Sequence, residues 1–158
     1  MSILIRKALK EDMPAVLLLI KELAVYEKEP DAVKIDSETL IEEGFGENPL
    51  FFCFVAEVEG KVVGIALTYF VFSTWKGRTL HLEDLIVTEK MRGTGVGMAL
   101  YKRVMEFGKE EGVSQVKWIV LDWNTPSIDF YEKTGAVMDK NWYIAAMDNE
   151  KLTAFLEK

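Results

Sequence analysis

The chain has 158 residues, of which 49% are hydrophobic, enough for one domain with a sizeable core and too many for a wholly disordered protein. It carries 19 Lys and Arg against 26 Asp and Glu, a formal net charge of -7. Nucleic-acid binding needs clustered cations, so this balance argues against a nucleic-acid partner, whereas an acidic surface attracts small cations such as amines.

The first third of the chain predicts one strand and two helices. Residues 2–8 read as a short strand. Two acidic residues then precede Pro14, a combination typical of a helix start, and apolar residues follow at helical spacing. Residues 26–35 form a charged loop, after which Asp36 or Ser37 can cap a second, shorter helix.

The middle of the chain predicts three strands and a helix. The runs FFCFVAEVEG and VVGIALTYFVF are rich in β-forming residues, and Glu59-Gly60 between them is typical of a hairpin turn. A third strand, TLHLEDLIVT, follows. A helix is expected from Val96, with Gly108 and Gly112 ending it.

The last part predicts two strands and two helices. The apolar run VKWIVLDW suits a strand in the middle of a sheet. Asn124 and Thr125 cap a helix with Pro126 at its first position, and Gly135 ends that helix. Residues 142–146 are expected to form a last strand, and residues 148–158 a short amphipathic helix. This order of strands and helices predicts a mixed α/β domain.

The scarcity of cysteine and histidine excludes several kinds of site. Cys53 is the single cysteine and His81 the single histidine, so neither an internal disulfide nor a common zinc site can form, and a Ser-His-Asp hydrolase would depend on His81 alone. The most apolar stretch, residues 62–72, falls well short of the ~20 residues that a membrane span needs. Because charge also interrupts the N-terminus before any signal core, we expect residues 1–158 to form a single cytoplasmic domain with no membrane partner.

The strongest local motif is RGTGVG at residues 92–97, which follows a strand and opens a helix. Glycines allow close approach of a ligand, and the N–H groups at a helix start favour an anion such as a pyrophosphate. A glycine-rich turn without a ligand is the alternative. A dinucleotide fingerprint would need glycine where Met98 stands, and the spacing of a nucleotide P-loop is absent.

The string LEDLIVTEKMRGTGVG (residues 82–97), followed by DWNTPSIDFYEKTGA (residues 122–136), resembles the GNAT superfamily of acyl-CoA-dependent N-acetyltransferases. The segments IKELAVYE, GFGENP and FSTWKGRTLHLED resemble its diamine and thialysine acetyltransferase branch, and the thialysine type most. The resemblance implies the GNAT fold, a mostly antiparallel mixed sheet flanked by helices. It also implies a homodimer, acetyl-CoA as co-substrate and no metal.

The resemblance further implies which residues hold the cofactor. Three strand residues pair through their backbone with the pantetheine arm, the glycine loop holds the pyrophosphate, and a later helix contacts the cofactor again. The implied cofactor residues are Leu85, Ile86, Val87, Arg92, Gly93, Thr94, Gly95, Val96, Gly97, Met98, Asn124, Pro126, Ser127 and Tyr131.

The implied catalytic residues are Glu83, near the acceptor amine, and Tyr131, beside the sulfur of the cofactor. Their residue types suit the chemistry, because an amine of pKa ~10.4 must lose a proton before it attacks, and the departing thiolate, with a conjugate acid of pKa ~8.5, can accept one from a tyrosine. A solvent-facing Glu83 and a core-packing Tyr131 are the structural alternatives. The implied amine-site residues are Tyr26, Glu27, Ser73, Thr74, Trp75, Glu83 and Asp84.

These features predict direct transfer of an acetyl group to a primary amine of a small cationic substrate, because Cys53 lies outside the motifs. Ser73 stands where diamine-preferring members of the family carry an acid, which favours a thialysine-like or lysine-like amine over a polyamine. The alternatives are an acetyltransferase for protein N-termini or aminoglycosides, and a CoA-binding sensor without catalysis.

Overall fold

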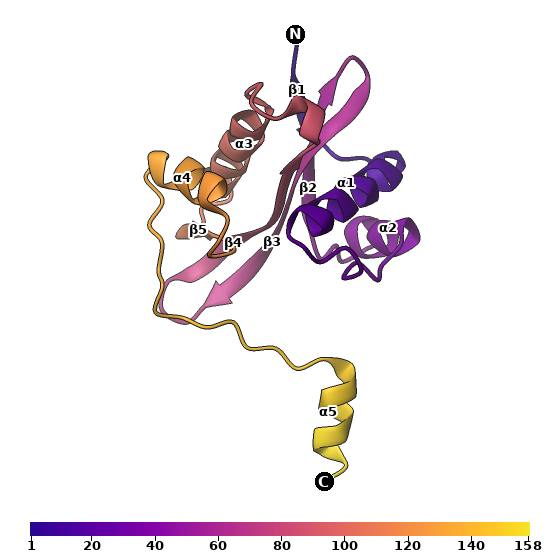
Figure 1. Ribbon diagram of the computed structural model, residues 1–158, viewed down its shortest axis with the longest axis vertical. Coiled ribbons are helices and arrows are strands. Elements are labelled where there is room, and N and C mark those ends of the chain that lie inside the picture. The colour runs from indigo at the N-terminus through magenta and orange to yellow at the C-terminus, as the bar shows by residue number, and fades with distance from the viewer. The chain divides into compact units, whose positions relative to one another are not determined.

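The computed structural model describes residues 1–158, which divide into two compact units, residues 1–119 and residues 120–158. The first unit is a sheet with helices on both faces, and the second consists of helices and extended chain (Figure 1).

The sheet of the first unit has five strands in the order β1-β2-β3-β4-β5. The strands are β1 (Leu4–Lys7), β2 (Phe52–Val58), β3 (Lys61–Ser73), β4 (Gly77–Val87) and β5 (Gln115–Lys117). The first four pair antiparallel, and β5 pairs parallel with β4. Glu59 and Gly60 both have positive φ in the turn between β2 and β3, so the predicted hairpin is confirmed.

Three α-helices cover the two faces of this sheet. They are α1 (Met13–Tyr26), α2 (Ser37–Phe45) and α3 (Val96–Glu110). Helices α1 and α2 lie on one face and α3 on the other (Figure 1). Short 3₁₀ turns at Lys10–Asp12 and Glu89–Met91 precede α1 and α3. The Asp36 carboxylate accepts the Thr39 N–H at 2.8 Å, which confirms the predicted cap of α2.

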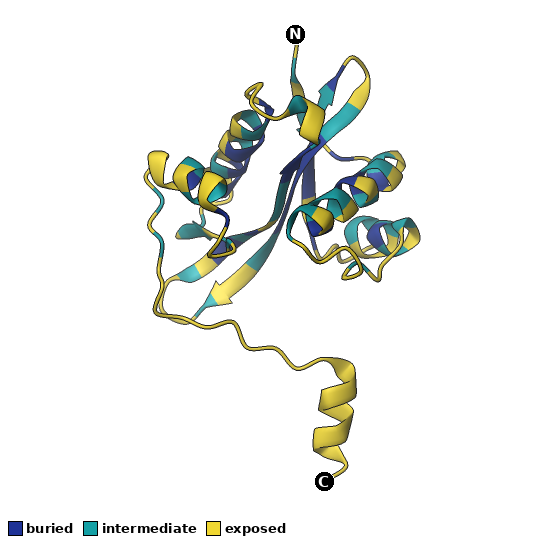
Figure 2. Ribbon diagram, viewed as in Figure 1, coloured by how far each residue is buried: buried dark blue, intermediate teal, exposed yellow.

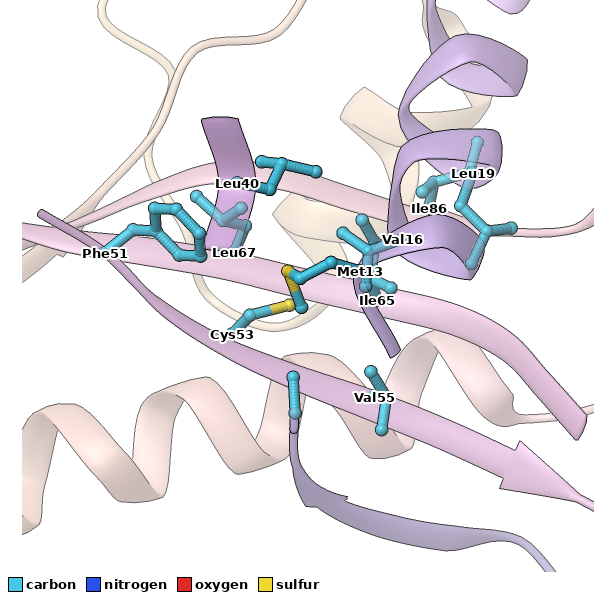
Figure 3. Packing of buried hydrophobic residues seen from close by; sticks show 11 residues of the cluster. Met13, Val16, Leu19, Leu40, Phe51, Cys53, Val55, Ile65, Leu67 and Ile86 are labelled. Carbon is cyan, nitrogen blue, oxygen red and sulfur yellow. The ribbon is translucent and has the colours of Figure 1, made fainter. Parts of the chain in front are cut away.

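The core on the α1 face joins both helices to three strands. Met13 and Val16 of α1 are fully buried against Ile65 of β3 and Ile86 of β4, and Leu40 brings α2 into the same cluster (Figure 3). On the opposite face, Phe107 of α3 packs against aromatic rings of β2 and β3, with ring centroids 5.3 to 5.9 Å apart.

Helix α3 continues past Gly108, which was expected to help end it. A side chain at Gly108 would place its Cβ 2.9 Å from Val116 Cγ2, so the glycine lets the helix approach β5 closely. Gly112 has a φ of +66° just after the helix, which agrees with its predicted role as a stop.

A β-bulge at Glu83 changes which side chains of β4 face α1. Thr68 of β3 pairs with Leu82, and its neighbour Leu67 pairs with Asp84, so Glu83 has no partner on β3. Before the bulge the even-numbered residues of β4 face α3, and after it Asp84 and Ile86 face α1, because they lie opposite Leu67 and Ile65. The bulge therefore turns two consecutive acidic residues toward the same face of the sheet.

Two predicted strands differ from the structure. The run 116–123 was expected in the middle of the sheet, but β5 ends at Lys117 and lies at the sheet edge, because it pairs with β4 alone. Residues 142–146, expected as a strand, are extended and exposed without strand pairing. A run of apolar residues favours a strand only where a neighbouring strand supplies hydrogen bonds.

The second unit contains α4 (Thr125–Lys133) and α5 (Asn149–Leu156), as the sequence predicts. The Asn124 side chain accepts the Ser127 N–H at 3.4 Å, Pro126 is the second rather than the first residue of α4, and Gly135 has a φ of +97° after it. Residues 139–158 are exposed throughout (Figure 2). None of the helices in the chain combines the length and the apolar character needed to cross a bilayer.

Candidate active site

A hydrogen-bonded group on β3 and β4 surrounds Glu83 on the α1 face of the sheet. The Tyr69 hydroxyl donates to Glu83 Oε2 at 2.8 Å, and His81 Nε2 lies 3.1 Å from the same oxygen. The Tyr69 and His81 rings pack together with centroids 4.9 Å apart. Glu83 is therefore held by two polar contacts, although about half of its side chain remains exposed (48%).

These contacts favour the ionised form of Glu83. The hydrogen bond with His81 lowers the pKa of the Glu83 carboxyl, and the Tyr69 hydroxyl acts in the same direction. Desolvation and the bond to Glu83 raise the pKa of Tyr69 to about 12, so the phenol stays protonated as a donor. Glu83 is consequently a fixed negative charge at neutral pH.

Asp84 and Glu27 add two carboxyl groups whose pKa values are raised, in contrast to that of Glu83. Burial, and then the charges of Glu83 and Glu27, raise the pKa of Asp84 to about 7. Glu27, which directly follows α1, has its pKa raised by desolvation and by the charge of Glu83. The structure therefore brings together three of the predicted amine-site residues, Glu27, Glu83 and Asp84, as an acidic cluster. The pKa is lowered at Glu83 and raised at the other two.

Sequence reasoning missed Tyr69 as a member of this group and interpreted His81 as structural. Both are in contact with Glu83, and the signal that could have found them is strand pairing. Tyr69 lies directly opposite His81 in the β3–β4 hairpin, a register that the turn residues around Gly77 fix.

Ser73, Thr74 and Trp75 lie at the tip of the same hairpin, apart from the acidic cluster. Ser73 is four residues beyond Tyr69 on β3, roughly 13 Å along an extended strand. Its hydroxyl accepts the N–H groups of Trp75 at 3.3 Å and Lys76 at 3.1 Å, and the Trp75 side chain is exposed. A compact amine held at Glu83 would not reach this tip.

The end of β4 offers free backbone groups at the predicted pantetheine position. Strand β5 pairs with β4 only from Thr79 to His81, so the edge near Leu85 and Val87 has no strand partner in this sheet. The Thr88 N–H bonds to Val63 of β3, and by alternation Ile86 also directs its backbone toward β3. Leu85 therefore presents its backbone N–H and C=O at the open edge, and Val87 presents its N–H there, because the Val87 carbonyl accepts a hydrogen bond from Arg92 Nε.

The glycine loop leaves open space above the start of α3. Gly93 and Gly95 have φ of +76° and +91°, and a Cβ added to either would meet no atom within 4 Å. Gly95 precedes the first turn of α3 (Val96, Gly97 and Met98), where no side chain caps the helix. Unpaired N–H groups at a helix start bind anions, so the loop fits a phosphate group.

The Arg92 side chain turns away from this open space. Its Nε donates to Val87 O at 3.0 Å, its Nη2 lies 3.4 Å from Glu22 Oε1, and its Cζ lies 5.1 Å from the Tyr26 ring centroid. Tyr26, predicted for the amine site, thus contacts the arginine of the cofactor loop. Thr94 Oγ1 donates to Met91 O at 2.6 Å and closes the turn before α3.

The remaining predicted cofactor residues belong to the second unit. Asn124 caps α4, Pro126 and Ser127 lie in its first turn, and Tyr131 lies near its end. Tyr131 and Asn124 are both buried, with 8% and 6% of their surfaces exposed.

Cys53 is unsuited to carry an acyl group. It is buried in the α1-face core (Figure 3), and burial raises the pKa of its thiol well above the ordinary value. A thiol that stays protonated is a poor nucleophile, which agrees with the predicted direct transfer. No group of three or more His, Cys, Asp or Glu side chains is arranged to hold a metal ion.

Comparison with known proteins shows which family shares these features. The model of the acetyltransferase (GNAT) family matches residues 7–136. The chain is 46% identical over 143 residues to thialysine N-epsilon-acetyltransferase of Sus scrofa, covering 85% of this chain and 84% of that protein. It is 37% identical over 158 residues to spermidine/spermine N(1)-acetyltransferase-like protein 1 of Homo sapiens, covering 94% of this chain and 23% of that protein. A solved aminoglycoside acetyltransferase from an uncultured soil metagenomic sample has a TM-score of 0.77 at 22% identity, covering 92% of this chain and 97% of that one.

The mixed sheet and the glycine loop that opens α3 both lie within residues 7–136, which match the acetyltransferase (GNAT) family, so the chain is an acyl-CoA-dependent acyltransferase. The chain belongs to the GNAT acetyltransferase family, which uses acetyl-CoA as co-substrate. The predicted family and fold are thereby confirmed.

Proposed function

We propose that this chain transfers an acetyl group from acetyl-CoA to a primary amine of a small cationic amino acid of the thialysine or lysine type. The observation that carries the proposal is the cluster of Glu27, Glu83 and Asp84 on the α1 face, an acidic site suited to an ammonium group. The 46% identity to a thialysine N-epsilon-acetyltransferase supports the same substrate class.

Acetyl-CoA supplies an activated thioester when it is bound. The backbone N–H and C=O of Leu85 and the N–H of Val87 would align its pantetheine arm, and the loop from Arg92 to Met98 would hold its pyrophosphate. Asn124, Pro126 and Ser127 are proposed as further contacts from the second unit.

The acidic cluster would bind the substrate as an ammonium ion and then take its proton. At pH 7 deprotonation of an amine of pKa ~10.4 costs about 4.6 kcal/mol, so a base at the point of attack contributes directly to the rate. Glu83 is ionised and accessible, and we assign it the proton transfer. Asp84, with a pKa of about 7, becomes charged as the pH rises through neutrality, which strengthens attraction of the cation. Tyr131 is assigned the return of a proton to the departing sulfur.

Replacing Gly95 with valine should weaken CoA binding by at least about tenfold. A β-branched residue is strained at a φ of +91°, and its side chain would occupy the space proposed for the phosphates. Isothermal titration calorimetry of folded protein measures the change. Gly60→Val, at a positive φ in the β2–β3 turn, is the matched control for backbone strain. Equal affinity in a folded Gly95→Val variant would remove the pyrophosphate assignment.

The amine is identified by a panel assayed with acetyl-CoA through thiol release, containing thialysine, lysine, diamines, spermidine, an aminoglycoside and an N-terminal peptide. We expect thialysine-like or lysine-like amines to exceed spermidine in kcat/KM. An aminoglycoside or peptide as the best substrate would favour those alternatives, and CoA binding without turnover of any amine would indicate a sensor.

Ser73→Asp should shift the ratio of kcat/KM toward spermidine by about tenfold, equivalent to ~1.4 kcal/mol. A carboxylate at the hairpin tip can pair with the distal cation of a long polyamine, whereas a compact amino acid held at Glu83 does not reach the tip and gains nothing from it. Aspartate can also accept the two N–H groups that Ser73 accepts. Ser73→Asn keeps this turn without the charge and is the matched control. An unchanged ratio in Ser73→Asp contradicts a specificity role for this position.

We further propose that residues 1–158 act as one domain, in a cytoplasmic homodimer, without nucleic-acid or membrane partners. The family match from residue 7 to residue 136 extends over parts of both units, which supports a single functional domain. Exposed apolar side chains in the second unit, among them Trp142, Tyr143 and Ile144, support a further protein contact. The net charge of -7 supports the absence of a nucleic-acid partner.

A further inference from the structure

One carboxylate on α1 bonds to three residues of the segment that leads into the glycine loop. Glu22 Oε2 accepts the Thr88 hydroxyl at 3.0 Å, and Glu22 Oε1 accepts the Glu89 backbone N–H at 2.8 Å. Arg92 Nη2 lies 3.4 Å from Glu22 Oε1. These residues are 66, 67 and 70 positions apart from Glu22 in the sequence, so the contacts fasten two distant parts of the chain to each other.

The contacts tie both ends of a 3₁₀ turn to α1, in addition to the turn's own hydrogen bonds from the Met91 N–H to Thr88 O at 2.9 Å and from the Arg92 N–H to Glu89 O at 3.2 Å. Thr88 and Glu89 begin the 3₁₀ turn after β4, and Arg92 directly precedes Gly93. Beyond Arg92, Gly93 and Gly95 lie in open surroundings and no side chain caps α3. The direction of the loop N–H groups therefore depends on how firmly residues 88–92 are held.

The charge of Glu22 has a clear counterpart. A carboxylate near a phosphate site repels the ligand unless a cation balances it. Arg92 provides that cation, and its guanidinium also packs on the Tyr26 ring and bonds to Val87 O. Glu22 and Arg92 thus form an ion pair with little net charge, so Glu22 acts on the loop by holding residues 88–92 in place rather than by its charge.

We infer that Glu22 is a positioning residue for the pyrophosphate loop, an inference that rests on the proposed use of this loop for CoA. Its carboxylate holds residues 88–92 in the conformation in which the N–H groups of Gly93 to Gly97 converge on the diphosphate. Because Glu22 lies one turn before Tyr26 at the end of α1, and Glu27 directly follows that helix, the same contacts set the position of the cofactor loop relative to the amine site.

The inference is tested by measuring CoA affinity by calorimetry in Glu22→Ala and Glu22→Gln. Glu22→Ala removes all three contacts and is expected to weaken CoA binding about tenfold or more. Glu22→Gln keeps an acceptor oxygen for Thr88 or Glu89 and is expected to lose about threefold. Glu43→Gln removes the same charge from an exposed position on α2 and should bind CoA as the wild type does. If Glu22 were only a counter-charge for Arg92, both Glu22 variants would bind the diphosphate more tightly, and that result overturns the inference.

Two further measurements separate positioning from general damage. Amide hydrogen exchange of free Glu22→Ala should be faster at residues 88–95 and unchanged in β2 and β3. With S-acetylpantetheine, which lacks the diphosphate, Glu22→Ala should keep wild-type kcat/KM within about twofold while its KM for acetyl-CoA rises about tenfold. Equal losses with both thioesters, or unchanged exchange at residues 88–95, overturn the inference.

The calorimetry and the exchange measurement do not require amine turnover. Wild-type protein that binds CoA but acetylates no amine would contradict the proposed function. The calorimetry and the exchange measurement would still decide the role of Glu22. Wild-type protein that does not bind CoA would overturn both.

Discussion

Tyr131→Phe is expected to lower kcat by about 10²-fold or more, with little change in KM, because it removes the proposed proton donor to the departing thiolate. The change deletes one hydroxyl from a side chain that is 8% exposed on α4, so the aromatic packing is retained. Steady-state kinetics under conditions in which the chemical step limits turnover measure the effect.

The leaving group distinguishes acid catalysis from a loss of packing. An aromatic thioester whose thiol has a pKa well below ~8.5 leaves without a proton, so the defect of Tyr131→Phe should shrink with such a substrate. Tyr143→Phe, at a residue that is 99% exposed in the same unit, is the matched control. A defect of equal size with both thioesters would assign Tyr131 to packing rather than to proton transfer.

Glu83→Gln is expected to reduce kcat/KM for the amine about 10²-fold at pH 7, and by less as the pH rises toward the amine pKa of ~10.4. The direction of this pH dependence follows from the ionisation state of Glu83. The hydrogen bond with His81 lowers the pKa of Glu83, so wild-type Glu83 is fully ionised throughout the range from pH 7 upward. The narrowing gap therefore reports the growing supply of neutral amine, which no longer needs a base.

The pH profile is measured as the ratio of variant to wild-type kcat/KM between pH 7 and pH 9.5. Asp84 titrates near pH 7 in the wild type, which can affect the first points, so the slope above pH 8 is decisive. Glu59→Gln, in the exposed β2–β3 turn, controls for the loss of one negative charge. A ratio that stays flat across this range contradicts the assignment of Glu83 as base.

The sequence predicted most of the fold because its local signals agree with the tertiary packing. The helix from Pro14, the Glu59-Gly60 turn and the Asn124 cap are each determined by neighbouring residues, and each is present. The strand expected at residues 142–146 failed for the opposite reason. Strand formation depends on a partner elsewhere in the chain, and a short run of apolar residues carries no information about that partner.

The candidate site was predictable to a similar degree. The resemblance to GNAT enzymes located the glycine loop and the acidic residues, which are chemical motifs with fixed spacing. It did not reveal Tyr69 or Glu22, because their contacts with Glu83 and with the loop come from strand pairing and from the packing of α1. Residues that orient a motif are selected by three-dimensional neighbours, so a search along the chain overlooks them.

The β-bulge at Glu83 decides to which face of the sheet the following side chains of β4 point, and therefore which acidic groups lie close enough to act together. In an unbroken strand, Glu83 and Asp84 would point to opposite sides, and the carboxylates could not share one cation. Deleting Glu83 would restore regular pairing with β3 and would leave Leu82, Asp84 and Ile86 on the faces that they occupy now, so the site would lose one of its two adjacent acids while the core kept its side chains. The acidity of this site is thus set by the length of a strand as much as by its composition. Substitutions alone would not place two consecutive acidic side chains on one face of a strand that has no β-bulge.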